Sequence, residues 1–180
     1  MNNERKWILR GGRVLNPAPF CLIGIVNVTP DSFSDGGKYI DPRNAVAHGL
    51  RLLDEGAGML DRGAESTRPF AEPVPEGEEI ARLMPVVARL REQRPDAVLS
   101  VDTLKAGTAR AALEGGADII NDVSACVADP ALLDVLAEYK PGYVLMHSQG
   151  SPREMQVNPR YGNVVEEILA FFEEHLARLG

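Results

Sequence analysis

The feature that most constrains the fold is a repeated alternation of short apolar runs with longer segments of helical periodicity. The apolar runs lie at about 21–26, 58–62, 97–101, 117–120 and 143–146, and the helical segments at about 43–55, 77–93, 105–114, 130–139 and 162–179. Short runs rich in Val, Ile and Leu are typical of buried parallel strands, and the segments between them are long enough for crossover helices. The sequence therefore predicts an α/β fold of five consecutive strand–helix units.

A polar residue ends every predicted strand. These residues are Asn27, Asp61 with Glu65, Asp102, Asn121 with Asp122, and His147. In a (β/α)₈ barrel all strand ends gather at one mouth, so this pattern favours a barrel over an open sheet. No Gly-x-Gly-x-x-Gly follows the first strand, which argues against a dinucleotide-binding sheet. Because a whole barrel takes eight units and about 250 residues, we predict a TIM (β/α)₈-type barrel truncated after its fifth unit.

The chain is predicted to be a single domain over residues 1–180. With 180 residues it is long enough for one core. Residues 7–20 contain two short apolar pieces around Gly11-Gly12 and end near Pro17 and Pro19, which predicts an N-terminal hairpin. Such a hairpin could close the bottom of a sheet or barrel.

Composition excludes several classes of partner. The net charge is −7 without a basic stripe, which argues against nucleic acid. No apolar run reaches the roughly 20 residues of a membrane span, and residues 1–6 lack the apolar core of a signal peptide. The two cysteines, Cys21 and Cys126, are expected to be reduced. The predicted location is the cytoplasm.

Two polar segments carry groups that can hold charged ligands. The segment Asn-Val-Thr-Pro-Asp-Ser-Phe-Ser-Asp-Gly-Gly (27–37) follows the first strand, and its oxygens can bind a cation or an anionic ligand. Glu-Ser-Thr-Arg-Pro (65–69) follows the second strand, where Arg68 beside hydroxyls can clamp a phosphate or carboxylate. Taken alone, either segment could be an ordinary turn.

The third and fourth strands end in groups that suit a flat heterocycle. Asp102, in Ser-Val-Asp-Thr, can accept hydrogen bonds from such a ring, although an Asp here could instead cap the next helix. Asn121, in Ile-Ile-Asn-Asp-Val-Ser-Ala, offers one acceptor and two donor hydrogens. The three histidines show no zinc-ligand spacing, and His48 and His175 are expected to be exposed on helices.

Five segments in the same order resemble dihydropteroate synthases: the two polar segments, the strings around Asp102 and Asn121, and Met-His-Ser-Gln-Gly-Ser-Pro-Arg-Glu-Met-Gln (146–156). The resemblance covers residues 7–180 and implies an N-terminal part of about five of the eight units. It implies an alkyl-transfer enzyme of folate biosynthesis. The amine of para-aminobenzoate attacks the methylene carbon of 6-hydroxymethyl-7,8-dihydropterin pyrophosphate, and pyrophosphate leaves.

The resemblance also implies roles for particular residues. Asn27 would bind Mg²⁺ and take part in catalysis, with Asp31 or Asp35 as further candidates for the metal. Thr67 and Arg68 would bind substrate, Arg68 also serving catalysis, and Asp102 and Asn121 would hold the pterin. Sulfonamides would compete for the site, and a homo-oligomer is a further option.

Two positions depart from the family pattern, and three family segments are not present in this sequence. Arg62 stands where the family has an aliphatic residue, and Phe70 where it has glycine. The family's sixth to eighth strands supply an Asp, a Lys, an Arg and a His that have no counterpart here, so the chain alone is expected to be inactive. Two alternatives stay open: a methyltetrahydrofolate-type pterin-binding methyltransferase, and a non-catalytic partial barrel that pairs with another chain.

Overall fold

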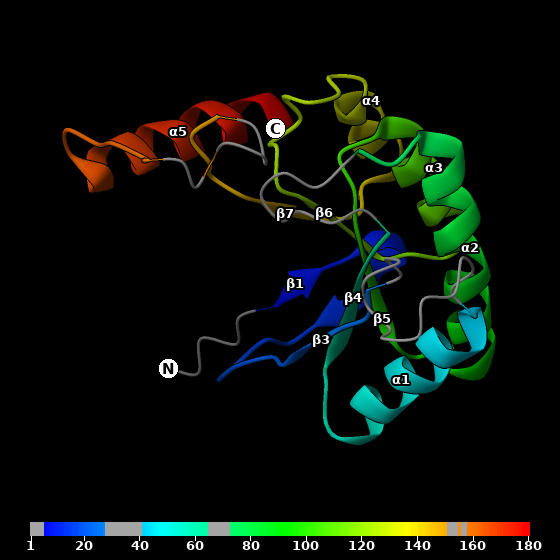
Figure 1. The fold of residues 1–180 in the computed structure, drawn as a ribbon. Helices are drawn as coiled ribbons and strands as arrows, with labels where there is room; N and C mark the ends of the chain where they lie inside the picture. Colours follow the sequence, from blue (N-terminus) through cyan, green and yellow to red (C-terminus); the bar gives the residue numbers. More distant parts are fainter. Residues whose placement is uncertain (1–5, 28–40, 65–72, 151–154, 156–157) are drawn as a thin grey trace.

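The protein folds around a five-stranded parallel sheet whose strands are adjacent in chain order, β3-β4-β5-β6-β7 (Figure 1). The computed structural model describes residues 6–27, 41–64, 73–150, 155 and 158–180. The strands are β3 (Ile23–Ile25), β4 (Met59–Gly63), β5 (Val98–Asp102), β6 (Ile119–Asp122) and β7 (Gly142–Leu145). Because neighbouring strands are parallel and follow one another in the chain, each connection must cross over the sheet and include a helix, as the alternating pattern predicts.

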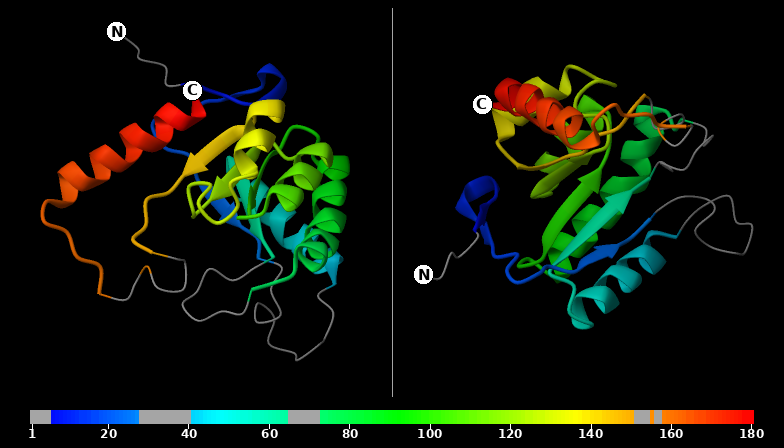
Figure 2. Two further views of the ribbon diagram at one scale, coloured as in Figure 1. Left: turned by 90° about the horizontal axis from the view of Figure 1, so that it is seen from above. Right: turned by 90° about the vertical axis from the view of Figure 1, so that its left-hand side faces the viewer.

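Five helices connect or follow these strands: α1 (Pro42–Asp54), α2 (Glu76–Gln93), α3 (Ala106–Glu114), α4 (Leu132–Tyr139) and α5 (Val164–Leu179). Helices α1 to α4 form a layer on one face of the sheet, and α5 extends past the β7 edge (Figures 1 and 2). Every predicted element is present, with bounds within two residues of those expected. The structure is thus the first five units of a (β/α)₈-type barrel.

Alternation along the strands separates two buried clusters. Leu60, Leu99, Val101 and Ile120 face the helices and pack with residues such as Leu90. Met59, Val98 and Ile119 point to the opposite face, called the inner face below, where they pack against Leu9. Burying a side chain of this size contributes roughly 1.5–3 kcal/mol, so both clusters hold the sheet in place.

The N-terminal hairpin covers the lower part of the inner face, as predicted. Its strands β1 (Trp7–Ile8) and β2 (Val14–Leu15) pair antiparallel around a 3₁₀ turn, η1 (Arg10–Gly12). Arg13 anchors the hairpin: its Nη1 donates to both oxygens of Asp118 at 3.1 Å and to the Ala97 carbonyl at 2.9 Å. Asp118 and Ala97 directly precede β6 and β5, so the hairpin sits at the N-terminal ends of the strands, away from the predicted site.

The first strand differs from the prediction. The apolar run Phe20–Val26 was expected to be covered on both faces, but Ile23 is 52% exposed and Ile25 is 50% exposed. Only Gly24 and Val26, which face α1, are buried. The inner-face cluster around Leu9 contains residues of β4, β5 and β6 but none of β3, so no described layer covers the inner side of this run.

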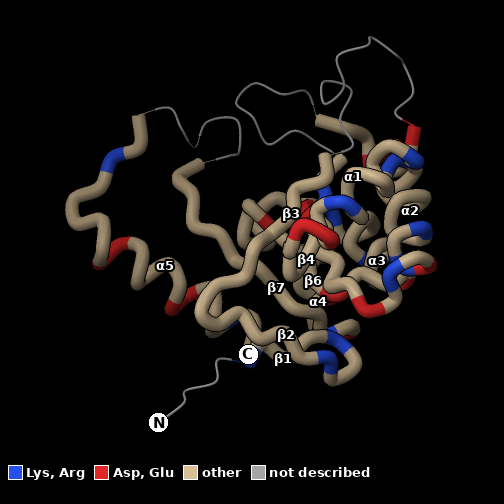
Figure 3. The backbone as a smooth tube through the Cα atoms, turned by 90° about the horizontal axis from the view of Figure 1, so that it is seen from below, with Lys and Arg blue, Asp and Glu red and all other residues tan. Residues whose placement is uncertain are grey.

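Charged residues of both signs are interspersed along the helical side of the molecule (Figure 3). None of the helices in the described residues is long and apolar enough to cross a membrane.

Candidate functional site at the strand ends

Three of the predicted site residues lie at one level of the inner face. Gly63 pairs with Asp102, and Asp102 pairs with Asn121. Ile25 pairs with Asp61. Two residues further along each strand, Asn27 is therefore level with Gly63. The parallel sheet therefore brings Asn27, Asp102 and Asn121 into one row at its C-terminal edge. Asn27 is exposed, whereas Asp102 and Asn121 are half-buried.

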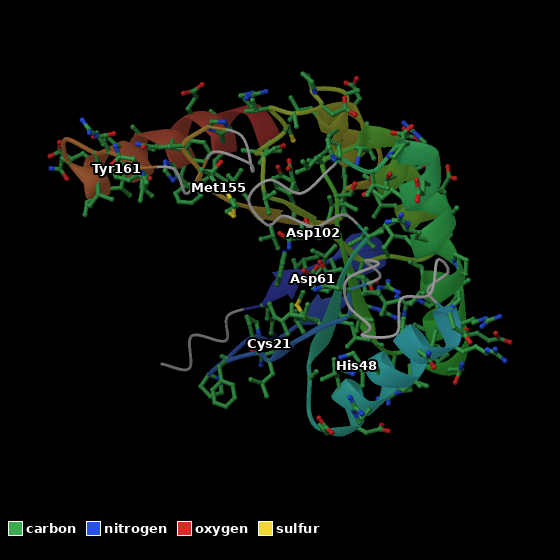
Figure 4. The ribbon with its side chains drawn as sticks, in the orientation of Figure 1. Cys21, His48, Asp61, Asp102, Met155 and Tyr161 are labelled. Carbon is green, nitrogen blue, oxygen red and sulfur yellow. The ribbon has the colours of Figure 1, made fainter. Side chains whose placement is uncertain are left out.

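Asp61 lies one level lower on the same inner face (Figure 4). The amide Nδ2 of Asn121 donates to Asp61 Oδ2 at 3.0 Å, across the intervening strand β5. Ser100 is the β5 residue in register with Asp61, and it is fully buried. Two atoms beside this bond, Asp61 Oδ1 and Ser100 Oγ, are buried without a hydrogen-bond partner among the described residues.

Asp102 does not cap the following helix, so this alternative is wrong. Helix α3 begins at Ala106, and its first amides are accepted by carboxylates from two other segments. Ala106 N donates to Asp129 Oδ2 at 2.8 Å, and Gly107 N donates to Glu76 Oε2 at 3.1 Å. The first amides of α3 are therefore satisfied by Asp129 and Glu76, and the capping of this helix does not depend on Asp102.

Asp122, next to Asn121, has a structural role. It is fully buried, and its oxygens accept from Ser124 N and Oγ, both at 2.7 Å, from Cys126 N at 2.6 Å, and from Tyr143 OH at 2.9 Å. These bonds fix a turn in which Ala125 and Cys126 both have positive φ. Burial raises the pKa of both the Tyr143 hydroxyl and the Cys126 thiol, which favours their protonated forms.

Arg62 is buried on the helix-facing side of β4. It is completely inaccessible, and its Nε, Nη1 and Nη2 have no hydrogen-bond partner in the described part of the chain. Burial, and secondarily the nearby Arg91, lowers the pKa of Arg62 to about 10. The side chain lies on the opposite face from Asp102 and Asn121, so Arg62 cannot reach a ligand at the strand ends.

The histidines form no common centre. His147 packs against Tyr161 and Phe171, with ring centroids 5.8 and 4.8 Å away. His175 was predicted to be exposed, but it is 8% exposed and stacks on Phe171 at 3.9 Å. His48 is half-buried on α1 rather than exposed, and its Nδ1 lies 2.8 Å from Arg51 Nη2. The two helical histidines were misjudged because helix faces cannot be oriented without their neighbours.

Comparisons with known proteins identify the family of this chain. The family model described as "Pterin binding enzyme" matches residues 23–180. The chain belongs to the pterin-binding enzyme family. The matched range contains all five parallel strands, including the row of Asn27, Asp102 and Asn121.

Individual relatives in this family are dihydropteroate synthases. The enzyme from Mycobacterium leprae is 47% identical over 154 residues, which are 85% of this chain and 54% of that enzyme. The Xanthomonas albilineans enzyme, solved with 4-aminobenzoic acid, has a TM-score of 0.83 at 46% identity, covering 95% of this chain and 61% of the other. The Yersinia pestis enzyme, solved as a sulfonamide drug complex, has a TM-score of 0.88 at 41% identity, covering 97% and 62%. The chain spans about half the length of the curated relatives that it matches.

Several residues singled out from the sequence lie outside the described residues. They are the metal candidates Asp31 and Asp35, the strand-end residue Glu65, the substrate-binding candidates Thr67 and Arg68, and Phe70, which departs from the family pattern. Asp61 was recognised from the sequence as a strand-end residue, but its contact with Asn121 was not. The period of two along β4 would have placed Asp61 on the same face as Met59, whereas the contact across β5 depends on the sheet register.

Among the described residues, Asn27 is of a type that suits the magnesium ion implied by the resemblance. Mg²⁺ takes oxygen ligands and commonly uses only one or two from the protein, together with water and substrate phosphates. The exposed amide of Asn27 offers such an oxygen at the end of β3. Within the described ranges, no group of three or more His, Cys, Asp or Glu side chains is placed to hold a metal.

Proposed function

We propose that this chain serves the dihydropteroate synthase reaction, in which 6-hydroxymethyl-7,8-dihydropterin pyrophosphate and para-aminobenzoate give 7,8-dihydropteroate and pyrophosphate. One observation carries the proposal: Asp102 and Asn121 lie side by side on the inner face at the C-terminal edge of the sheet. The helix-capping role that could have explained Asp102 belongs to Asp129 and Glu76.

In this reaction the amine nitrogen bonds to the methylene carbon of the pterin while the carbon–oxygen bond to pyrophosphate breaks. Asp102 and Asn121 hold the heterocycle, so that the methylene group is fixed at the open edge of the sheet. Asn27 is the proposed magnesium ligand, and the ion supplies positive charge next to the leaving pyrophosphate when bound. Thr67 and Arg68 follow β4 in the sequence, and we assign them to substrate binding, with the permanent charge of Arg68 stabilising the leaving group.

Further partners follow from the same assignment. Sulfonamides are proposed as competitors of para-aminobenzoate, because a sulfonamide drug is bound in the related Yersinia pestis structure. A cytoplasmic location is proposed because Cys21 and Cys126 are both free thiols, which persist in a reducing compartment. Homo-oligomer formation is also part of the proposal.

Ligand choice tests the proposal. Isothermal titration of the purified chain with the pterin pyrophosphate should show binding that strengthens when Mg²⁺ is added, and Asn27→Ala should remove most of that strengthening. Titration with 5-methyltetrahydrofolate is the matched comparison, since a methyltransferase would bind it. Preference for the methylated folate, or absence of pterin pyrophosphate binding, would contradict the proposal.

A further inference from the structure

Asp61 differs from the buried carboxylates Asp118 and Asp122 in its hydrogen bonds. Asp118 and Asp122 each accept hydrogen bonds with both oxygens, as expected of structural carboxylates. Among the described residues, the carboxylate of Asp61 accepts one hydrogen bond, from Asn121 through Oδ2. Its Oδ1 is buried without a partner among the same residues. Within this part of the chain, the carboxylate of Asp61 therefore contacts a residue that is predicted to bind the pterin.

The hydrogen bond between Asn121 and Asp61 fixes the orientation of the Asn121 amide. A carboxylate only accepts hydrogen bonds, so it selects the Asn121 orientation in which Nδ2 faces Asp61 at 3.0 Å. The opposite amide orientation would place two oxygens against each other. Asn121 Oδ1 is consequently held away from Asp61, as an acceptor for another donor.

Two buried polar atoms beside this bond have no hydrogen-bond partner among the described residues. Ser100 lies on β5 between the two partner strands and is fully buried, and its Oγ is one of these atoms. Asp61 Oδ1 is the other. A buried polar group without a partner is unfavourable and requires an explanation, and a polar ligand at the strand ends would supply one.

We propose that Asp61 is a positioning residue for pterin recognition. By fixing the amide of Asn121, Asp61 makes Oδ1 of Asn121 the acceptor for an N–H group on the edge of the heterocycle. The inference rests on the proposed function for the identity of the ligand, but the orientation of the amide depends only on the contact described above.

The variant Asp61→Asn tests this role with little change in volume. An amide at position 61 can either donate or accept, so both orientations of Asn121 become acceptable. We expect the affinity for 6-hydroxymethyl-7,8-dihydropterin pyrophosphate to fall about ten-fold, since a hydrogen bond to a charged group is replaced by an unselective one. Asp96→Asn removes the same charge at an exposed site, and it should leave the affinity unchanged.

A double-mutant cycle separates positioning from a general structural effect. If Asp61 acts through Asn121, Asp61→Asn should weaken pterin binding in the unmodified protein but change it less than about two-fold in an Asn121→Ala background. Equal weakening in both backgrounds, or no weakening in the unmodified background, would overturn the proposal.

The side-chain amide of Asn121 gives a readout that needs no ligand. In NMR spectra of the unliganded protein, its Nδ2 hydrogens should be protected from exchange, and Asp61→Asn should reduce that protection. If the unmodified chain binds no pterin, the proposed function fails, whereas the amide signal still decides whether Asp61 orients Asn121. An Asn121 amide that is equally protected in Asp61→Asn protein would overturn the positioning role.

Discussion

At the scale of single residues, the charged side chains in and next to the sheet differ in how many hydrogen bonds they make. Asp118 and Asp122 are fully hydrogen-bonded and support the hairpin and the turn after β6. Asp61 keeps an unpartnered oxygen beside the predicted site, and Arg62 is buried under the helices with three nitrogens unpartnered within the described chain. Neighbouring residues on β4 thus point to opposite faces, one towards the site and one into the structural core.

Replacing Arg62 with leucine should stabilise the protein. An aliphatic side chain of similar length removes a desolvated charge that has no hydrogen-bond partner among the described residues. Replacing buried ion pairs with apolar side chains often stabilises proteins by about 1–4 kcal/mol, and we expect a gain within this range. Urea unfolding measures the change, with the exposed Arg89→Leu as a control expected to stay within about 0.5 kcal/mol. A lower free energy of unfolding for Arg62→Leu would show that the buried guanidinium has a compensating partner.

Replacing Tyr143 with phenylalanine should destabilise the protein in a pH-dependent manner. Loss of the bond to Asp122 should lower the free energy of unfolding at pH 8 by about 1.5–3 kcal/mol. Burial raises the pKa of Tyr143 in the folded state, so its contribution is complete below the unfolded pKa of about 10 and decreases as the pH rises further. The gap between wild type and variant should therefore shrink between pH 8 and 10.5.

The control for this measurement is Tyr161→Phe, whose hydroxyl makes no hydrogen bond to the described residues and should affect stability little at either pH. A gap between wild type and Tyr143→Phe that stays constant from pH 8 to pH 10.5 would contradict the account.

Sequence reasoning reached some of these residues and missed others for a physical reason. Asp102 and Asn121 were predicted as site residues because each ends an apolar strand with a group that suits a flat heterocycle, and because the strings around them resemble dihydropteroate synthases. The pairing of Asp61 with Asn121 joins residues 60 positions apart and depends on the register of three strands. The burial of Arg62 was also beyond prediction, because the residue type itself favours the surface.

At the scale of elements, helix α3 is held at its N-terminus by its neighbours. Its own N-cap, Lys105, provides no side-chain cap, and the first amides donate to Asp129 and Glu76 instead. Asp129 Oδ1 also accepts from Ala131 N at 3.1 Å, immediately before α4. One carboxylate thus connects the starts of two consecutive helices near the strand ends.

Replacing Asp129 with alanine should lower the free energy of unfolding by about 1–2 kcal/mol, because a lost helix cap has an effect of this size. Thermal or urea unfolding would measure it. Asp134→Ala is a matched control, since Asp134 is exposed on α4. Equal stability of the Asp129 and Asp134 variants would show that Asp129 is not the cap.

The element boundaries were predictable because each strand is a short apolar run and each helix has its own helical periodicity in the sequence. The environment of an element was less predictable. The run around β3 is as apolar as a central strand, yet Ile23 and Ile25 are half exposed because no described residues pack over the inner face of β3. Burial depends on the neighbours of a strand, and the sequence of the strand alone does not contain them.

At the scale of the whole molecule, the residues that stabilise the sheet and the residues of the proposed site lie in different places. The helix-facing side and the hairpin below contain the two hydrophobic clusters. The C-terminal edge of the inner face carries Asn27, Asp102 and Asn121 in one row. The five parallel strands are sufficient to form this row, which is the part of the proposed synthase site that the structure describes.

The most direct test of this account is calorimetric binding of 6-hydroxymethyl-7,8-dihydropterin pyrophosphate to the unmodified chain and to Asp102→Asn. We predict a single site, with affinity at least ten-fold lower in Asp102→Asn, since the carboxylate makes a charge-assisted bond to the ring. The exposed Asp54→Asn should bind as the unmodified chain does. Binding that is unaffected by Asp102→Asn, or no binding to the unmodified chain, would contradict the assignment of the pterin site to these strand ends.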